Sequence, residues 1–117
     1  MGRAALVAGA PSPKNRQGML ADLFERIETL IDASDRDLDQ IERTLTDGYA
    51  KALSLEAEQY RIQKRITEVA HSLKSGDAEA AQELAALAQR LDGTAGELSE
   101  LRGRLGALRR HAEAVRA

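Results

Sequence analysis

The chain has 117 residues, the length of a single domain, and 43% of them are hydrophobic, yet it contains only one Phe, two Tyr and no Trp. A composition dominated by Ala, Leu, Glu, Arg, Asp and Gln favours helices and gives a β-sheet little to pack. The absence of cysteine excludes disulfides, thiolate metal sites and cysteine nucleophiles, and the net charge of −2 argues against a general polyanion binder.

Residues 1–18 precede the first clear periodic pattern. Their apolar run around Leu6 is shorter than a secretory signal or a membrane helix requires, and Pro11 and Pro13 follow it. We therefore expect a flexible N-terminal tail over 1–18 and a helical domain over 19–117. The expected location is the cytoplasm, without contact to a membrane.

Residues 19–33 are predicted to form a short helix. Apolar residues recur here at alternating steps of four and three, which places them on one helix face. Ser34 followed by Asp35 is a suitable N-terminal cap for a second helix, and this predicts a break in the chain. Because the period itself continues without interruption, a single helix from Leu20 to Leu73 is the alternative.

Two long amphipathic helices are predicted next, over 35–74 and 78–115. The step of four and three, which is typical of coiled coils, continues through both of them. The predicted core positions are Leu38, Ile41, Leu45, Gly48, Ala52, Leu55, Gln59, Ile62, Ile66, Val69 and Leu73 in the first, and Ala80, Leu84, Leu87, Leu91, Thr94, Leu98, Leu101, Leu105, Leu108, Ala112 and Val115 in the second.

A tight turn is predicted between these helices. Gly76 can adopt the left-handed conformation that ends a helix, and Asp77 can cap the first amides of the next one. A connection this short joins antiparallel neighbours, so the second helix should fold back along the first.

The antiparallel pairing can be tested within the sequence itself. When residues are paired at equal distances from the turn, every core position faces a core position, and Gly48 falls opposite Leu105. The polar positions Gln59 and Thr94 share one layer, as buried polar groups require. The acidic start of the first helix also faces the arginine-rich end of the second. The predicted fold is all-α: an antiparallel coiled-coil helical hairpin with an additional N-terminal helix.

Two apolar surfaces remain outside this hairpin seam. Folding residues 19–33 back onto the hairpin would give a three-helix bundle, whereas a two-fold partner would give a dimeric helical bundle. We expect these surfaces to bind protein, either a partner or a second copy in a homodimer. Their residues are Leu20, Leu23, Phe24, Ile27, Leu30 and Ile31 on the first, and Tyr49, Leu53 and Tyr60 on the second.

No chemistry-bearing motif is complete. Glu68 and His71 have the spacing found in carboxylate-bridged di-iron bundles, but His111 has Leu108 where a second Glu would be needed. We therefore predict no metal site, no cofactor, no catalytic residue and no small-molecule substrate.

These patterns favour a non-enzymatic coiled-coil module for protein–protein interaction: an adaptor, a scaffold or a small chaperone. The alternative is a nucleic-acid-associated accessory protein that uses the basic end of the second long helix, where Arg109, Arg110 and Arg116 surround His111. These cations also suit the last turns of a helix and face the acidic segment, so protein binding is the preferred hypothesis.

Overall fold

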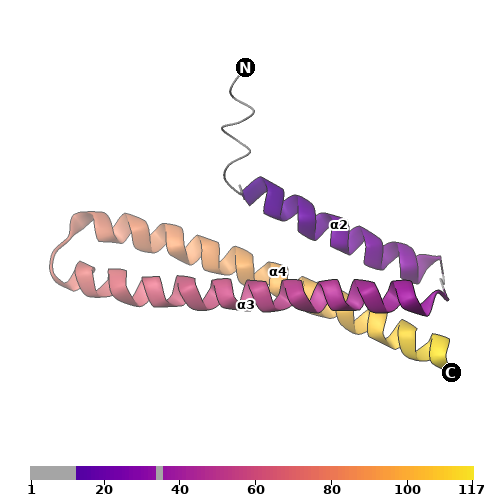
Figure 1. The fold of residues 1–117 in the computed structure, drawn as a ribbon. Helices are drawn as coiled ribbons and strands as arrows, with labels where there is room; N and C mark the ends of the chain where they lie inside the picture. The colour runs from indigo at the N-terminus through magenta and orange to yellow at the C-terminus, as the bar shows by residue number, and fades with distance from the viewer. Residues whose placement is uncertain (1–12, 34–35) are drawn as a thin grey trace, which may run out of the picture.

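The structure is a computed structural model, and it describes residues 13–33 and 36–117. These residues form three helices and no strand: α2 (Pro13–Asp32), α3 (Leu38–Lys74) and α4 (Ala78–Arg116). Figure 1 shows α3 and α4 paired as a long hairpin, with α2 lying along the end of the hairpin opposite its turn. The predicted all-α class and the close packing of the two long helices are confirmed. None of the described helices is long and apolar enough to cross a membrane.

Helix α2 begins earlier than the sequence pattern suggested. Its first residue is Pro13, although a flexible tail was expected up to residue 18. Proline suits the first position of a helix because its ring fixes φ and because an N–H there would have no partner within the helix. The steps of four and three between apolar residues start only at Leu20, so the sequence pattern carries no sign of the turns before it.

Helices α2 and α3 are separate, so the chain does not continue as one helix. Helix α2 ends at Asp32, and α3 starts after Asp37, whose side chain accepts a hydrogen bond from the backbone N–H of Gln40 at 3.2 Å. The cap predicted at Ser34 lies outside the described residues. The break reverses the chain, so that α2 runs back along α3 (Figure 1).

The turn between α3 and α4 has the predicted chemistry. Gly76 has a φ of +92°, and its N–H donates to the carbonyl of Leu73 at 3.0 Å. Asp77 caps α4, because its carboxylate accepts from the N–H of Glu79 at 3.0 Å. A left-handed residue followed by a cap lets α4 start soon after α3 ends.

The contacts between α3 and α4 follow the predicted register. A Cβ added to Gly48 would overlap Cδ2 of Leu105, so these two residues face each other directly. Charged pairs lie beside the seam, as between Arg65 and Glu83, whose closest N and O atoms are 2.9 Å apart. Further ion pairs between the two helices join Arg90 with Glu58, Arg102 with Glu56 and Arg116 with Glu42.

The core is thicker at the end where α2 lies. Ile27 of α2, Ile41 of α3 and Leu108 of α4 meet in this three-helix part and are at most 1% exposed. Towards the turn only α3 and α4 remain, with a smaller cluster of Ile62, Val69, Ala80 and Leu87. Burial of these apolar side chains, at about 25 cal/mol per Å², is the main stabilising contribution to the fold.

Candidate protein-binding surface

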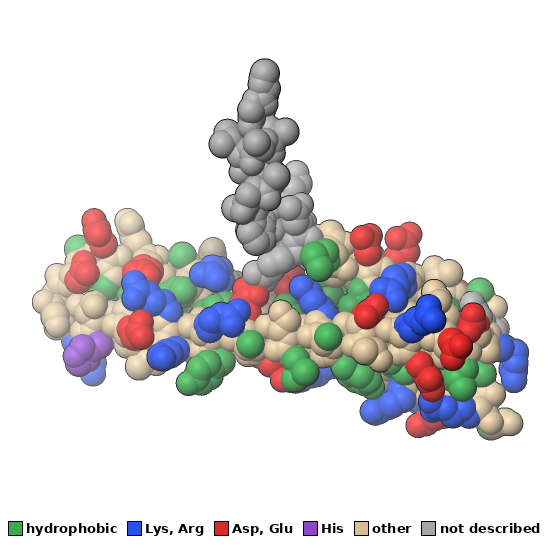
Figure 2. Space-filling view, in the orientation of Figure 1, with side chains coloured by type: hydrophobic (Ala, Val, Ile, Leu, Met, Phe, Trp, Pro, Cys, Tyr) green, Lys and Arg blue, Asp and Glu red, His purple; other side chains and the backbone are tan. Residues whose placement is uncertain are grey.

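Three large, exposed apolar side chains of α3 lie on one face of that helix. Tyr49 is 42% exposed, and Leu53 and Tyr60 are each 66% exposed. Their spacing of four and seven residues brings them to the same side of the helix. We call this set the tyrosine stripe. Figure 2 shows hydrophobic side chains along the edge of the hairpin that faces away from α2.

Helix α2 leaves the stripe open because it docks on the other flank of α3. Arg26 of α2 reaches Asp47 at 3.1 Å and donates to the hydroxyl of Thr44 at 3.2 Å. That hydroxyl belongs to a buried residue and donates in turn to the carbonyl of Gln40 at 2.9 Å. Thr44 and Asp47 lie on the side of α3 opposite the stripe. Docking of α2 there therefore leaves the stripe exposed.

The predicted binding residues therefore divide into two groups that the structure keeps apart. The α2 face lies inside the chain's own core, while the tyrosine stripe stays exposed and is not covered by α2. Of the α2 residues, Leu20, Leu23, Ile27 and Leu30 are buried, and Phe24 and Ile31 are half-buried against the same cluster.

Arg104 ties α2 to α4 and covers the ring of the half-buried Phe24. The guanidinium lies 4.4 Å from the centre of the Phe24 ring, and it hydrogen-bonds Glu28 at 2.6 Å and Glu100 at 2.9 Å. The hydrogen bond to Glu28, followed by the one to Glu100, raises the pKa of Arg104 above its ordinary value. A cation held over an aromatic face by two carboxylates closes this edge of the core.

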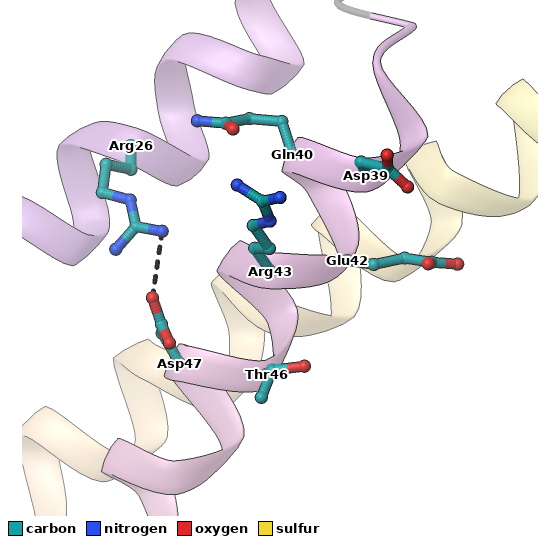
Figure 3. Close-up of a pocket in the computed structure, with 7 residues that line it drawn as sticks. All are labelled: Arg26, Asp39, Gln40, Glu42, Arg43, Thr46 and Asp47. Carbon is teal, nitrogen blue, oxygen red and sulfur yellow. Dashed lines mark ion pairs between the residues drawn. The ribbon is translucent and has the colours of Figure 1, made fainter.

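A polar depression of about 670 Å³ lies where α2 meets the start of α3. Figure 3 shows Arg26 of α2 directed at Asp47 of α3, with Arg43 on the same wall. Acidic and basic groups alternate around it, and Arg26 is directed at the protein's own carboxylate. This arrangement is that of a seam between two helices. It lacks the convergent donors or acceptors that would hold a ligand.

A second hollow, of about 450 Å³, adjoins the tyrosine stripe at Tyr60. It is shallow, and Tyr60, Gln63, Lys64, Thr67 and Glu68 line it. The sequence interpretation missed these neighbours because it followed large apolar residues only. Their spacing was the available signal, since Lys64 and Thr67 follow Tyr60 by one and two helical turns on the same face.

Several titratable side chains are engaged in ion pairs on the helix surfaces. Glu68, half of the Glu68–His71 pair, accepts a hydrogen bond from Arg65 at 3.4 Å. Within residues 13–33 and 36–117, no three His, Asp or Glu side chains lie close enough together to hold a metal ion. At the basic end of α4, Arg116 pairs with Glu42 of α3, and Arg109 and Arg110 are exposed.

Comparison of the chain with protein-family models, with curated proteins and with solved structures finds no match. The tyrosine stripe and the hollow beside it therefore define the candidate site on geometry alone.

Proposed function

We propose that this chain is a non-catalytic, antiparallel coiled-coil module that binds another protein through the tyrosine stripe. The observation that carries the proposal is the exposure of Tyr49, Leu53 and Tyr60 on one face, beside a shallow hollow. Aromatic side chains at the centre of an exposed patch supply much of the affinity of protein interfaces. Their alignment along a straight helix suits a partner that presents a helix of its own.

The coiled-coil part of the proposal rests on the seam of the hairpin. Core positions alternate by three and four residues along both helices, and a glycine in one meets a leucine in the other where the predicted register pairs them. In Figure 1, α4 crosses α3 along the length of the hairpin, as helices do when they wind around each other.

The nucleic-acid alternative receives less support from the contacts. A polyanion site needs unpaired cations, ideally with an aromatic platform. Of the arginines at the basic end of α4, Arg116 pairs with Glu42 of α3, whereas Arg109 and Arg110 are exposed. Nearer the middle of the helix, Arg102 and Arg104 form ion pairs with carboxylates of α2, α3 or α4 itself. The two tyrosines lie on α3, among carboxylates as well as lysines.

The test is a charge placed on the stripe. We expect Leu53→Lys with Tyr60→Lys to abolish capture of partner proteins from a cell lysate, as identified by mass spectrometry, while circular dichroism and thermal melting stay unchanged. Met19→Lys is the matched control, because Met19 is 65% exposed on α2, away from the stripe. Capture of the same proteins by the stripe variant and by the control would contradict the proposal.

A further inference from the structure

Charged residues continue the tyrosine stripe at both of its ends. On the same face of α3, Asp39 and Glu42 lie towards the N-terminal end of the helix, and Lys64, His71 and Lys74 lie towards its C-terminal end. All five are exposed, and Glu42 also pairs with Arg116 of α4 in the same chain. The face therefore runs from acidic through largely apolar to basic over roughly 50 Å of helix. Glu56, beside its middle, is paired with Arg102 of α4.

An order of this kind is complementary to itself when reversed. If a second α3 is laid antiparallel on the first, with the two-fold axis between Glu56 and Ala57, the stripe meets its own copy and each charged end meets the opposite charge. The facing pairs are then Asp39 with Lys74, Glu42 with His71, Thr46 with Thr67, Tyr49 with Lys64, and Leu53 with Tyr60, each occurring twice by symmetry.

We infer that the partner of the tyrosine stripe is a second copy of this chain, bound antiparallel through α3 in this register. The inference rests on the proposed function and names its partner. Two-fold symmetry counts every favourable pair twice, so a modest stripe gains from self-association. An interface with so few large side chains is small, and it gives a weak dimer that depends on concentration.

The hollow beside Tyr60 fits this arrangement. In the proposed register the partner copy's stripe, which faces Tyr60 and Lys64, approaches the hollow that these residues line with Thr67. The ring of Tyr49 then lies next to the ammonium group of Lys64, a favourable cation–π pair. The two hollows of the dimer are filled by the two stripes.

Another two-fold register shows that the complementarity is specific. With the axis at Leu53, Tyr49 would face Ala57 and Asp39 would face Thr67, so both an aromatic contact and a charge pair would be lost. A parallel pairing would set like charges against each other at both ends of the helix, which is unfavourable.

Two single charge reversals and their mixture test the pairing of the ends. Asp39→Lys places a cation opposite Lys74 of the other copy, and Lys74→Glu places a carboxylate opposite Asp39 of the other copy. Each variant alone therefore repels its own copy. We expect each to dimerise roughly ten-fold more weakly than the wild type in sedimentation equilibrium at low salt. An equimolar mixture of the two variants should form a heterodimer more strongly than either variant associates with itself. In the heterodimer, a cation faces a carboxylate at both ends.

The mixture also separates repulsion from unfolding. Recovery of association by mixing would show that neither substitution acts by unfolding the chain. Dimerisation of both single variants at wild-type strength would overturn the proposed pairing of the ends.

Cysteine crosslinking tests the register, since the native chain contains no cysteine. We expect Leu53→Cys mixed with Tyr60→Cys to give a disulfide between the two variants, because these positions face each other. Self-crosslinking of Leu53→Cys as the main product would overturn the register. A wild-type chain that stays monomeric at millimolar concentration would overturn self-association, and the proposed function would stand if stripe-dependent capture of another protein persisted.

Discussion

At the scale of single residues, Gly48 is the position at which the hairpin depends on having no side chain. The two long helices approach closely enough here for Leu105 to occupy the space of a Cβ. The opposite condition holds on the outer side of α4, where a Cβ at Gly96 or Gly103 would have no neighbour within 4 Å. Identical substitutions at these glycines should therefore have opposite effects on stability.

We expect Gly48→Ala to lower the free energy of unfolding by about 1–3 kcal/mol, because Leu105 must move or leave its rotamer. Gly103→Ala is the control, and it should raise the free energy of unfolding by up to about 1 kcal/mol through better helix propensity. Urea denaturation measures both. A Gly48→Ala protein as stable as the Gly103→Ala protein would show that the two helices do not meet in this register.

At the scale of elements, the turn and the hairpin register were predictable because both follow from short-range rules. Gly76 and Asp77 specify a turn through their own backbone preferences, and the spacing of the leucines determines which positions meet. The side on which α2 docks was not predictable. Its apolar face fits either flank of α3, and the choice depends on contacts such as that between Arg104 and Glu28, which are far apart in the sequence.

The first turns of α2 show a different limit of sequence reasoning. The apolar steps of four and three start only at Leu20, so in the sequence a helix that starts at Pro13 looks like a tail. The tyrosine stripe was predictable from spacing, and its charged continuation was not, because charged positions on a helix face are usually solvated.

Helix α2 should contribute a large part of the stability through Ile27, which is 1% exposed among side chains of all three helices. We expect Ile27→Ala to cost about 2–5 kcal/mol in the free energy of unfolding, because it removes apolar burial and leaves a cavity. Met19→Ala, at an exposed position of the same helix, should change it by less than about 0.5 kcal/mol. Equal, small effects in urea denaturation would mean that α2 is not docked on the hairpin.

At the scale of the whole molecule, the two ends of the hairpin differ in their number of layers. The end near α2 has three helices around one core, with Ile41 and Leu108 fully buried, whereas the end near the turn has two helices, and Leu73 there is 40% exposed. Local opening of a structure is easiest where the fewest apolar contacts must be broken.

We expect amide hydrogen exchange to follow this difference. Amides of α3 around Ile41 and of α4 around Leu108 should exchange most slowly, and amides near Val69 and Ala80 should exchange faster by several-fold or more. Native-state exchange followed by mass spectrometry measures this profile. Uniform protection along both long helices would indicate that the hairpin opens only as one cooperative unit.

The position of the two tyrosines has a consequence for spectroscopy. Because the chain has no tryptophan, Tyr49 and Tyr60 are its dominant near-ultraviolet chromophores, and both lie on the exposed stripe of α3. Tyrosine emission and absorbance at 280 nm therefore report on that surface and hardly at all on the core. Quenching by iodide should be nearly as efficient in the folded monomer as in urea, and protection from iodide should appear only when the stripe is covered. The fluorescence of the two tyrosines thus reports whether a binding partner covers the stripe.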